Sequence, residues 1–235
     1  MNPLTSPLVL AADAAIDLQM HTTFSDGTWT PEQLIDDVVR EQFGLVAITD
    51  HDRVDTAAAL QHLAVEKHLP LLTAVEMSTS WKGELTDVLC YGFAPEKNAL
   101  QDLAQAIAHR QPENTREVCE NLRKTGISFP DPSELDALLA KPSAQQPHAL
   151  VALLKTLGYG AGEPSAGKMI TEAGFFWATN DLASVCDAAH RSGAVCLIAH
   201  PGRGDGFTRY DAHLLDELRR EVPIDGFEVY YQSAL

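Results

Sequence analysis

Short apolar runs alternate with helical patterns in the first part of the chain. The apolar runs predict six strands, four early and two near the end of the sequence: residues 15–20, 44–49, 70–76, 86–92, 194–199 and 226–231. Two amphipathic helices separate the first three strands. One begins at Thr30-Pro31 with Gln33 as its capping partner, and the other covers residues 56–67. This alternation predicts parallel strands in an α/β fold.

The alternation stops in the middle of the chain. Residues 97–176 contain no convincing strand, only apolar positions at helical spacing that are interrupted by prolines. The α/β pattern resumes with a predicted helix over 181–191, for which Asn180 is the expected N-cap and Gly193 lies past the end. We therefore expect an all-α insertion of residues 97–176 within an α/β domain.

Three of the apolar runs end on side chains that can bind metal. The run that ends at Ile48 is followed by Asp50 and His51, a second run reaches Glu76, and a third reaches His200. Because parallel strands place their carboxyl ends at one edge, we expect these groups to converge there. Neutral imidazoles and carboxylates are the donors that divalent ions need at neutral pH. The sequence therefore predicts a metal site built from several strands.

Asp50 admits two interpretations. Its carboxylate is either a metal ligand or the acceptor that orients an imidazole, and we favour the second. A lone histidine at a strand end is more often a hydrogen-bonded structural residue. Three strand ends that agree favour ligation instead.

Composition narrows the classes of function. With 235 residues and 45% apolar content, the chain can bury a full core. Its formal net charge of −16 disfavours a protein that holds nucleic acid with Lys and Arg, although two or three bound divalent ions would attract an anionic substrate locally. The apolar stretch 8–12 is too short for a membrane span, and the four cysteines are widely separated. We expect a cytoplasmic protein without a membrane partner.

Five motifs are specific enough to be taken together. They are Asp-Leu-x-x-His-Thr-x-x-Ser-Asp-Gly-Thr-x-Thr-Pro-Glu at 17–32, Ile-Thr-Asp-His-Asp at 48–52, Val-Glu-Met-Ser at 75–78, Leu-Cys-Tyr-Gly-Phe at 89–93 and Ala-His-Pro-Gly-Arg at 199–203. This set resembles the PHP (polymerase and histidinol phosphatase) domain family, especially its small bacterial phosphoesterases. The likeness extends from about Asp17 to Tyr231.

The resemblance implies a fold and a ligand set. The implied fold is a distorted (β/α)7 TIM-like PHP barrel over residues 15–96 and 177–235, with the helical insertion at 97–176 and without its last C-terminal unit. The family's site holds a cluster of two or three Mn, Zn or Fe ions. The implied metal ligands are His21, Asp26, His51, Glu76 and His200. The implied substrate contacts are His148 and Arg203.

The chain departs from the family pattern at several positions. Gln19 replaces a histidine ligand, and an amide oxygen is a weaker donor for a transition metal than imidazole. Asp87 replaces a second histidine and favours harder ions such as Mn or Mg. Gln146 replaces the arginine of an Arg-Pro-His segment, and the family's terminal Ser-Asp-x-His motif is absent. Gln19 and Asp87 stay in the predicted ligand set, and an incomplete metal cluster stays an open alternative.

Two functions are compatible with these residues. The leading hypothesis is a metal-dependent phosphoesterase, a phosphoric ester hydrolase in which metal-activated water attacks a nucleotide, a short oligonucleotide or another small phosphorylated metabolite. Asp50 and His51 are the residues that we expect to act in catalysis, and Glu76 is expected to join two ions. The alternative is a catalytically weakened PHP domain that serves as a binding or regulatory module, as Gln19 and the missing terminal ligands suggest.

Overall fold

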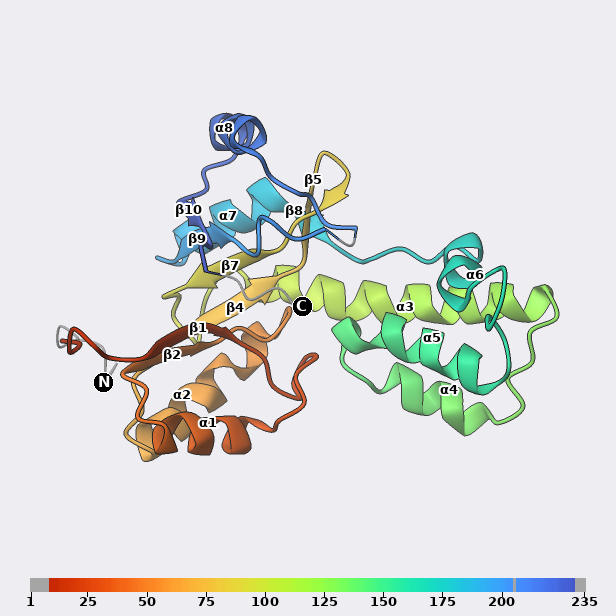
Figure 1. Ribbon diagram of the computed structural model, residues 1–235, viewed down its shortest axis with the longest axis horizontal. Helices are drawn as coiled ribbons and strands as arrows, with labels where there is room; N and C mark the ends of the chain where they lie inside the picture. Colours follow the sequence, from red (N-terminus) through yellow and green to blue (C-terminus); the bar gives the residue numbers. More distant parts are fainter. Residues whose placement is uncertain (1–8, 205, 231–235) are drawn as a thin grey trace. The chain divides into compact units, whose positions relative to one another are not determined.

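The computed structural model describes residues 9–204 and 206–230 (Figure 1). The chain divides into two compact units. One contains the residues up to Ala104 and those from Thr179 onward, and the other contains Gln105–Ala178. The sequence predicts the insertion at 97–176. The second unit therefore begins eight residues after the predicted start and ends two residues after the predicted end.

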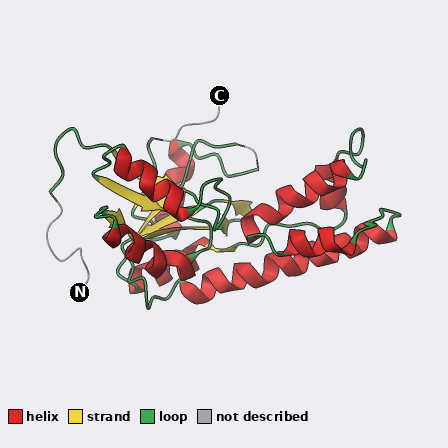
Figure 2. Cartoon of the chain, turned by 90° about the horizontal axis from the view of Figure 1, so that it is seen from below, coloured by secondary structure: helices red, strands yellow, loops and turns green. Residues whose placement is uncertain are grey.

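Three small sheets, all in the first unit, contain the described strands (Figure 2, yellow). The first is parallel and consists of β1 (Ile16–Met20), β2 (Leu45–Ile48) and β3 (Leu71–Leu72). The second has the order β10-β9-β7-β4, formed by Gly226–Phe227, Val195–Ile198, Val88–Tyr91 and Ala74–Met77. The third has the order β6-β5-β8, formed by Glu84–Leu85, Thr79–Trp81 and Asn180–Asp181.

The second sheet is mixed. Strand β7 runs antiparallel to both β4 and β9, whereas β9 and β10 are parallel. Strands β4 and β7 are antiparallel because the connection between them is short. About ten residues separate Met77 from Val88, which is too few for the crossover that a parallel pair needs. The predicted α/β class is confirmed, but among the described residues the strands do not close into the TIM-like barrel that the resemblance implied.

Helix α1 (Pro31–Arg40) begins as the sequence predicts. The Thr30 hydroxyl accepts a hydrogen bond from the Gln33 N–H at 3.3 Å, and the Gln33 side chain accepts one from the Thr30 N–H at 2.9 Å. Helix α2 (Ala57–Glu66) follows the second predicted stripe. Both helices pack on the first sheet through a shared cluster of buried apolar side chains. The capping box of α1 and the apolar stripes of both helices are therefore present as predicted.

One predicted cap is wrong. Helix α7 covers Leu182–Arg191, and its N-cap is Asp181, whose carboxylate accepts a hydrogen bond from the Ser184 N–H at 2.9 Å. Both Asn180 and Asp181 pair in β8, but Asn180 is buried and its amide donates to the Leu103 carbonyl at 3.0 Å. Either residue could cap this helix by type, and the Asp181 side chain is the one that does so.

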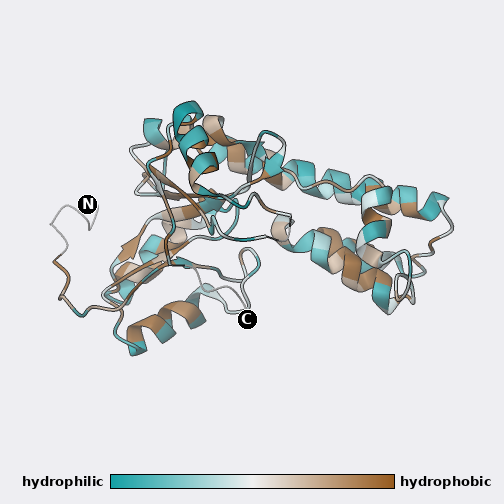
Figure 3. Ribbon diagram, turned by 45° about the horizontal axis from the view of Figure 1, so that its top comes forward, coloured by the Kyte–Doolittle hydropathy of each residue, from teal (hydrophilic) through white to brown (hydrophobic). Residues whose placement is uncertain are grey.

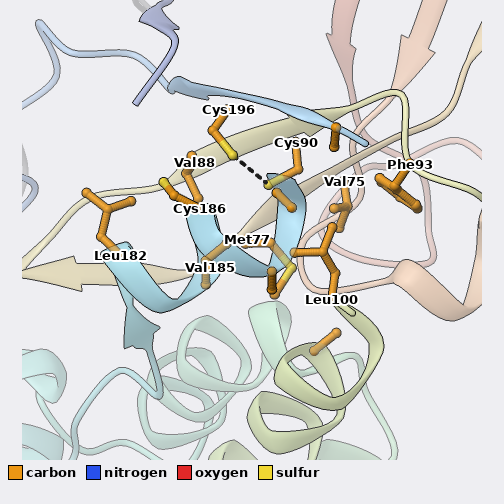
Figure 4. Packing of buried hydrophobic residues seen from close by; sticks show 14 of the residues in the cluster. Val75, Met77, Val88, Cys90, Phe93, Leu100, Leu182, Val185, Cys186 and Cys196 are labelled. Carbon is orange, nitrogen blue, oxygen red and sulfur yellow. Dashed lines mark hydrogen bonds between the residues drawn. The ribbon is translucent and has the colours of Figure 1, made fainter. Parts of the chain in front are cut away.

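The largest core of the first unit packs α7 and α8 (Ala212–Glu221) against β4, β7 and β9. Figure 4 shows the thiols of Cys90, Cys186 and Cys196 within this core, among aliphatic side chains. All four cysteines of the chain are free and buried. These three thiols therefore lie among apolar side chains in the metal-free protein.

The second unit has its own core, formed by the later part of α3 (Gln101–Lys124) with α4 (Pro132–Leu139), α5 (Gln146–Thr156) and α6 (Ala166–Glu172). Residues 105–178 contain no strand, as predicted for the insertion. The helices carry both hydrophilic and hydrophobic residues along their length (Figure 3), as helices that cover a core require. Within the described part of the chain, no helix has the length and apolar character needed to cross a bilayer.

Candidate metal centre

Strand pairing brings His51 beside Glu76. His51 follows β2 and forms a parallel bridge with Glu76 of β4. The Glu76 N–H donates to the Thr49 carbonyl at 3.2 Å, and the Asp52 N–H donates to the Glu76 carbonyl at 2.9 Å. The end of the first sheet therefore joins the second sheet at this point, and both side chains start from paired backbone.

Asp87 and His200 reach the same place from the second sheet. Asp87 immediately precedes β7, His200 follows β9, and the Ala199 N–H donates to the Asp87 carbonyl at 3.0 Å. Because β7 is antiparallel to β4 and β9, its start lies at the edge where those two strands end. The sequence led us to expect only the carboxyl ends of parallel strands at this edge, and Asp87 shows that the start of an antiparallel strand contributes as well.

The Glu76 carboxylate lies at the centre of the cluster and is almost fully buried. Its Oε2 atom lies 3.1 Å from His21 Nε2 and 3.9 Å from His51 Nε2. The same oxygen accepts a hydrogen bond from Gln19 Nε2 at 3.0 Å. Its Oε1 atom lies 3.0 Å from His200 Nε2. The two oxygens of one carboxylate therefore face different histidines.

Two further carboxylates surround these histidines. Asp26 Oδ1 lies 3.2 Å from His21 Nδ1, and Asp26 Oδ2 lies 3.9 Å from His51 Nε2. Asp87 Oδ2 lies 3.7 Å from His200 Nε2. The structure thus brings the whole predicted ligand set into one cluster: Gln19, His21, Asp26, His51, Glu76, Asp87 and His200.

Two groups within the cluster could each hold a metal ion. One is His21, His51 and Glu76, and the other is Glu76, Asp87 and His200; in each, the ligand atoms lie within 4.8 Å of one another. Ligands bonded to one ion at about 2.1 Å stand roughly 3 to 3.5 Å apart, close to the observed separations. In addition, His51 Nδ1 is buried without a hydrogen-bond partner among the described residues. These residues therefore fit a divalent metal site, with Glu76 shared by both groups.

Burial and charge oppose each other in the cluster. Burial disfavours protonation of His21, but the carboxylates of Asp26 and Glu76 outweigh it and raise the pKa of His21 to about 10. Burial also disfavours ionisation of Glu76, yet the surrounding histidines hold its pKa well below the ordinary range. The pKa of Asp87 is raised to about 7 by burial, with the Glu76 charge adding to the shift. A metal ion that binds here would displace protons.

Asp50 holds the loop that follows β1. Its Oδ1 atom accepts hydrogen bonds from the Thr22 N–H and the Ser25 hydroxyl, both at 2.7 Å, and Oδ2 accepts one from the Thr22 hydroxyl at 2.7 Å. The sequence favoured Asp50 as an acceptor for an imidazole, whereas the observed donors are hydroxyl and amide groups. These bonds fix the segment between His21 and Asp26, so Asp50 positions two of the candidate ligands.

Close packing also fixes this loop. A Cβ atom on Gly27 would come within 2.2 Å of the His21 carbonyl oxygen, so no larger residue fits there. The Arg53 guanidinium donates to the Phe24 carbonyl at 2.8 Å and lies 5.3 Å from the centroid of the Phe24 ring. The loop is therefore held by backbone, side-chain and ring contacts together.

Two acidic residues that the sequence analysis missed support the centre. The Glu228 Oε2 atom accepts a hydrogen bond from the His200 N–H at 2.7 Å, and Asp52 Oδ1 accepts one from the Ser78 N–H at 3.0 Å. His200 and Asp52 both have positive φ angles, 32° and 54°, which non-glycine residues seldom adopt. Asp52 belongs to the Ile-Thr-Asp-His-Asp motif and could have been found there. Glu228 follows a two-residue strand and carries no such signal.

The cluster opens into a cleft of about 820 Å³ within the first unit. Arg203, a predicted substrate contact, lines this cleft, and its guanidinium lies 4.3 Å from the centroid of the Phe207 ring. The cleft also includes Phe227 and Tyr230, both of which are exposed. The cleft therefore has carboxylates and histidines at its base, and the Arg203 guanidinium and apolar side chains around them.

His148, the other predicted substrate contact, belongs to the second unit, near the start of α5. Its ring centroid lies 5.8 Å from that of Trp177. The neighbouring Gln146 is buried: its amide donates to the Leu139 and Lys141 carbonyls at 3.2 and 3.0 Å. Gln146 therefore stabilises the helical unit, and a substrate contact from His148 stays a prediction.

A PHP domain model matches residues 17–160, more than half of the chain. The chain belongs to the PHP domain family. The matched region includes every candidate ligand of the PHP centre except His200, which lies later in the chain. The resemblance that the sequence motifs indicated is thus confirmed.

Several known proteins are similar to this chain. The 3',5'-nucleoside bisphosphate phosphatase of Chromobacterium violaceum is 28% identical over 207 residues, which cover 86% of this chain and 73% of that protein. A 5'-3' exoribonuclease of Salmonella typhimurium is 30% identical over 197 residues, covering 80% and 66%. The solved structure of an amidohydrolase from Chromobacterium violaceum, with bound sulfate, has a TM-score of 0.70 at 24% identity and covers 91% and 76%. The two sequence relatives are named for phosphate ester hydrolysis, so the predicted class of PHP hydrolase is confirmed.

Proposed function

We propose that this chain is a metal-dependent phosphoesterase that hydrolyses a nucleotide, a short oligonucleotide or another small phosphorylated metabolite. The observation that supports this most strongly is the division of the Glu76 carboxylate, with Oε2 facing His21 and His51 and Oε1 facing His200. A carboxylate whose two oxygens face two donor groups suits a pair of ions. Divalent ions held there would lower the pKa of a coordinated water and neutralise charge on a phosphate.

The chain's own residues account for binding and orientation. Asp50 fixes the loop that carries His21 and Asp26, and Glu228 fixes the backbone of His200. Arg203 supplies a guanidinium to the cleft, where its paired N–H donors match the oxygens of a phosphate. The names of the relatives, a nucleoside bisphosphate phosphatase and an exoribonuclease, support a nucleotide or oligonucleotide as the substrate class. We propose His148 as a further phosphate contact.

The proposal is tested with a variant of one candidate ligand. His51→Ala should lower the rate of hydrolysis of nitrophenyl phosphate and of nucleoside mono- and bisphosphates, with added Mn²⁺, by at least about 100-fold. His213→Ala, which changes an exposed histidine of α8, serves as the control and should keep the wild-type rate. Equal rates for His51→Ala and the wild type would remove His51 from the mechanism.

A second candidate function is a catalytically weakened PHP domain that binds a ligand or regulates another protein. The specific observation in its favour is that Gln19 Nε2 donates to Glu76 Oε2 at 3.0 Å, so an amide N–H occupies an oxygen that an ion would need. Elemental analysis after loading with Mn²⁺, which prefers nitrogen and oxygen donors, separates the two functions. Fewer than one metal ion per chain, together with no hydrolysis, would favour the weakened domain.

A further inference from the structure

A second group of possible metal ligands lies at the opposite end of β9 from the metal centre. It consists of His190 in the last turn of α7, Cys196 in β9 and Asp225 just before β10. Along an extended strand the four-residue step from Cys196 to His200 spans about 13 Å. None of the three residues lines the cleft. The group is therefore separate from the site proposed for hydrolysis.

The three side chains already converge. His190 Nε2 lies 2.8 Å from Asp225 Oδ2, and the same oxygen accepts a hydrogen bond from the Cys196 N–H at 2.7 Å. One ligand atom from each residue lies within 4.8 Å of the others. The residues come from three elements that are distant in sequence, so the fold itself assembles an imidazole, a thiol and a carboxylate at one point.

A fourth donor is available from the same helix as His190. Cys186 and His190 are four residues apart in α7 and so lie on the same face of the helix. Cys186 and Cys196 belong to the same buried core, and Figure 4 labels both; the Cys196 thiol also lies 4.0 Å from that of Cys90. Two sulfurs, one imidazole and one carboxylate make up a donor set that a four-coordinate transition metal prefers.

We infer that Cys186, His190, Cys196 and Asp225 form a second metal site, which takes one thiophilic divalent ion of the Zn²⁺ class. The ion can enter from solvent, because the side chains of His190 and Asp225 are 34% and 40% exposed while both cysteines are buried. On binding, each coordinating thiol releases its proton to solvent, and the contact between His190 and Asp225 gives way to bonds from each to the ion. The site ties α7, β9 and β10 together.

Cobalt distinguishes this site from the metal centre in the cleft. The candidate ligands in the cleft offer only nitrogen and oxygen, so sulfur-to-cobalt charge-transfer absorption in the near ultraviolet reports the cysteine site alone. The full chain, stripped of metal with a chelator and titrated with Co²⁺, should develop this band and saturate at one thiolate-bound ion per chain. The absence of the band at saturating Co²⁺ would overturn the inference, whether or not the cleft binds metal.

Two variants on the exposed side of the site assign its ligands. His190→Ala and Asp225→Asn should each weaken the Co²⁺ binding that gives the thiolate band by at least about 10-fold. His213→Ala is the matched control and should leave the band unchanged. Far-ultraviolet circular dichroism establishes that each variant is folded before titration. A band of wild-type strength in both folded variants would show that other cysteines bind the ion and would overturn the assignment.

Discussion

Gln19 occupies a position where the family pattern has a histidine ligand, so it changes the chemistry of the metal centre. Its amide donates to Glu76 Oε2, the oxygen that also faces His21 and His51. When the amide N–H faces Glu76, it competes with a metal ion for the carboxylate oxygen. When the amide oxygen faces the ion instead, it is only a weak ligand. The side chain at position 19 therefore sets the affinity of one of the two groups that could hold an ion.

Replacing this amide with an imidazole should strengthen metal binding. Gln19→His removes the N–H from Glu76 Oε2 and adds a better donor, so we expect Mn²⁺ or Zn²⁺ to bind at least about 10-fold more tightly. Isothermal titration calorimetry on the metal-free protein measures this change. Gln105→His, on an exposed position of α3, is the control and should have no effect. Unchanged or weaker affinity in Gln19→His would show that position 19 does not face the ion.

At the residue scale, the sequence identified the candidate metal ligands better than the residues that hydrogen-bond around them. His51, Glu76 and His200 stood out because polar, ionisable groups at the ends of apolar runs have no packing role. Thr22 and Ser25 did not stand out, because their hydrogen bonds to Asp50 join residues far apart in the sequence and leave no local pattern. The acceptor role of Asp50 was anticipated, but its donors could only be found from the structure.

At the scale of elements, the loop between His21 and Asp26 depends on one buried carboxylate. Asp50 receives three hydrogen bonds from this loop. Asp50→Ala removes the acceptor of these three buried bonds, so we expect the free energy of unfolding to fall by about 2 to 4 kcal/mol and metal affinity to fall with it. Urea unfolding and metal titration measure the two quantities. Wild-type metal affinity in this variant would show that the loop is positioned without Asp50.

The N-cap of α1 provides the matched control on a different element. Thr30→Ala removes one half of the capping box and should lower the free energy of unfolding by about 1 kcal/mol. Metal affinity should not change, because α1 carries none of the candidate ligands. Loss of metal affinity comparable to that of Asp50→Ala would mean that general destabilisation, not the loop contact, controls the centre.

The elements with strong local signals were predictable. The capping box of α1, the stripe of α2 and the helical character of 97–176 follow directly from the sequence. Strands β5, β6 and β8 were missed because two or three residues carry too short a pattern. The antiparallel direction of β7 was also missed. The resemblance implied a parallel barrel, whereas the connection between β4 and β7 is too short for a parallel pair.

At the scale of the whole molecule, an acidic protein proposed to bind an anionic substrate needs a local source of positive charge. The formal net charge is −16. Arg203 provides one cation in the cleft, and bound divalent ions would provide several more at the floor. Metal binding and substrate attraction are therefore expected to be linked, and removal of metal should weaken both.

Protons and metal ions should compete for the centre. In the metal-free protein the pKa of His21 is raised to about 10, above that of an unfolded histidine, so its protonation stabilises the fold below pH 6.5 and this contribution is lost as the pH rises through about 10. Metal binding at pH 7 should therefore release protons, and metal affinity should increase with pH up to about 10. Calorimetry in two buffers of different ionisation enthalpy measures this release. Binding without proton release at pH 7 would contradict a ligand role for His21.

Anomalous X-ray diffraction from crystals grown with Mn²⁺ is the sharpest test of a metal centre built around Glu76. We expect anomalous density within bonding distance of Glu76, with one ion near Oε2, His21 and His51 and a second near Oε1, Asp87 and His200. No anomalous density at Glu76, or imidazoles of His51 and His200 that share no ion with it, would contradict this centre.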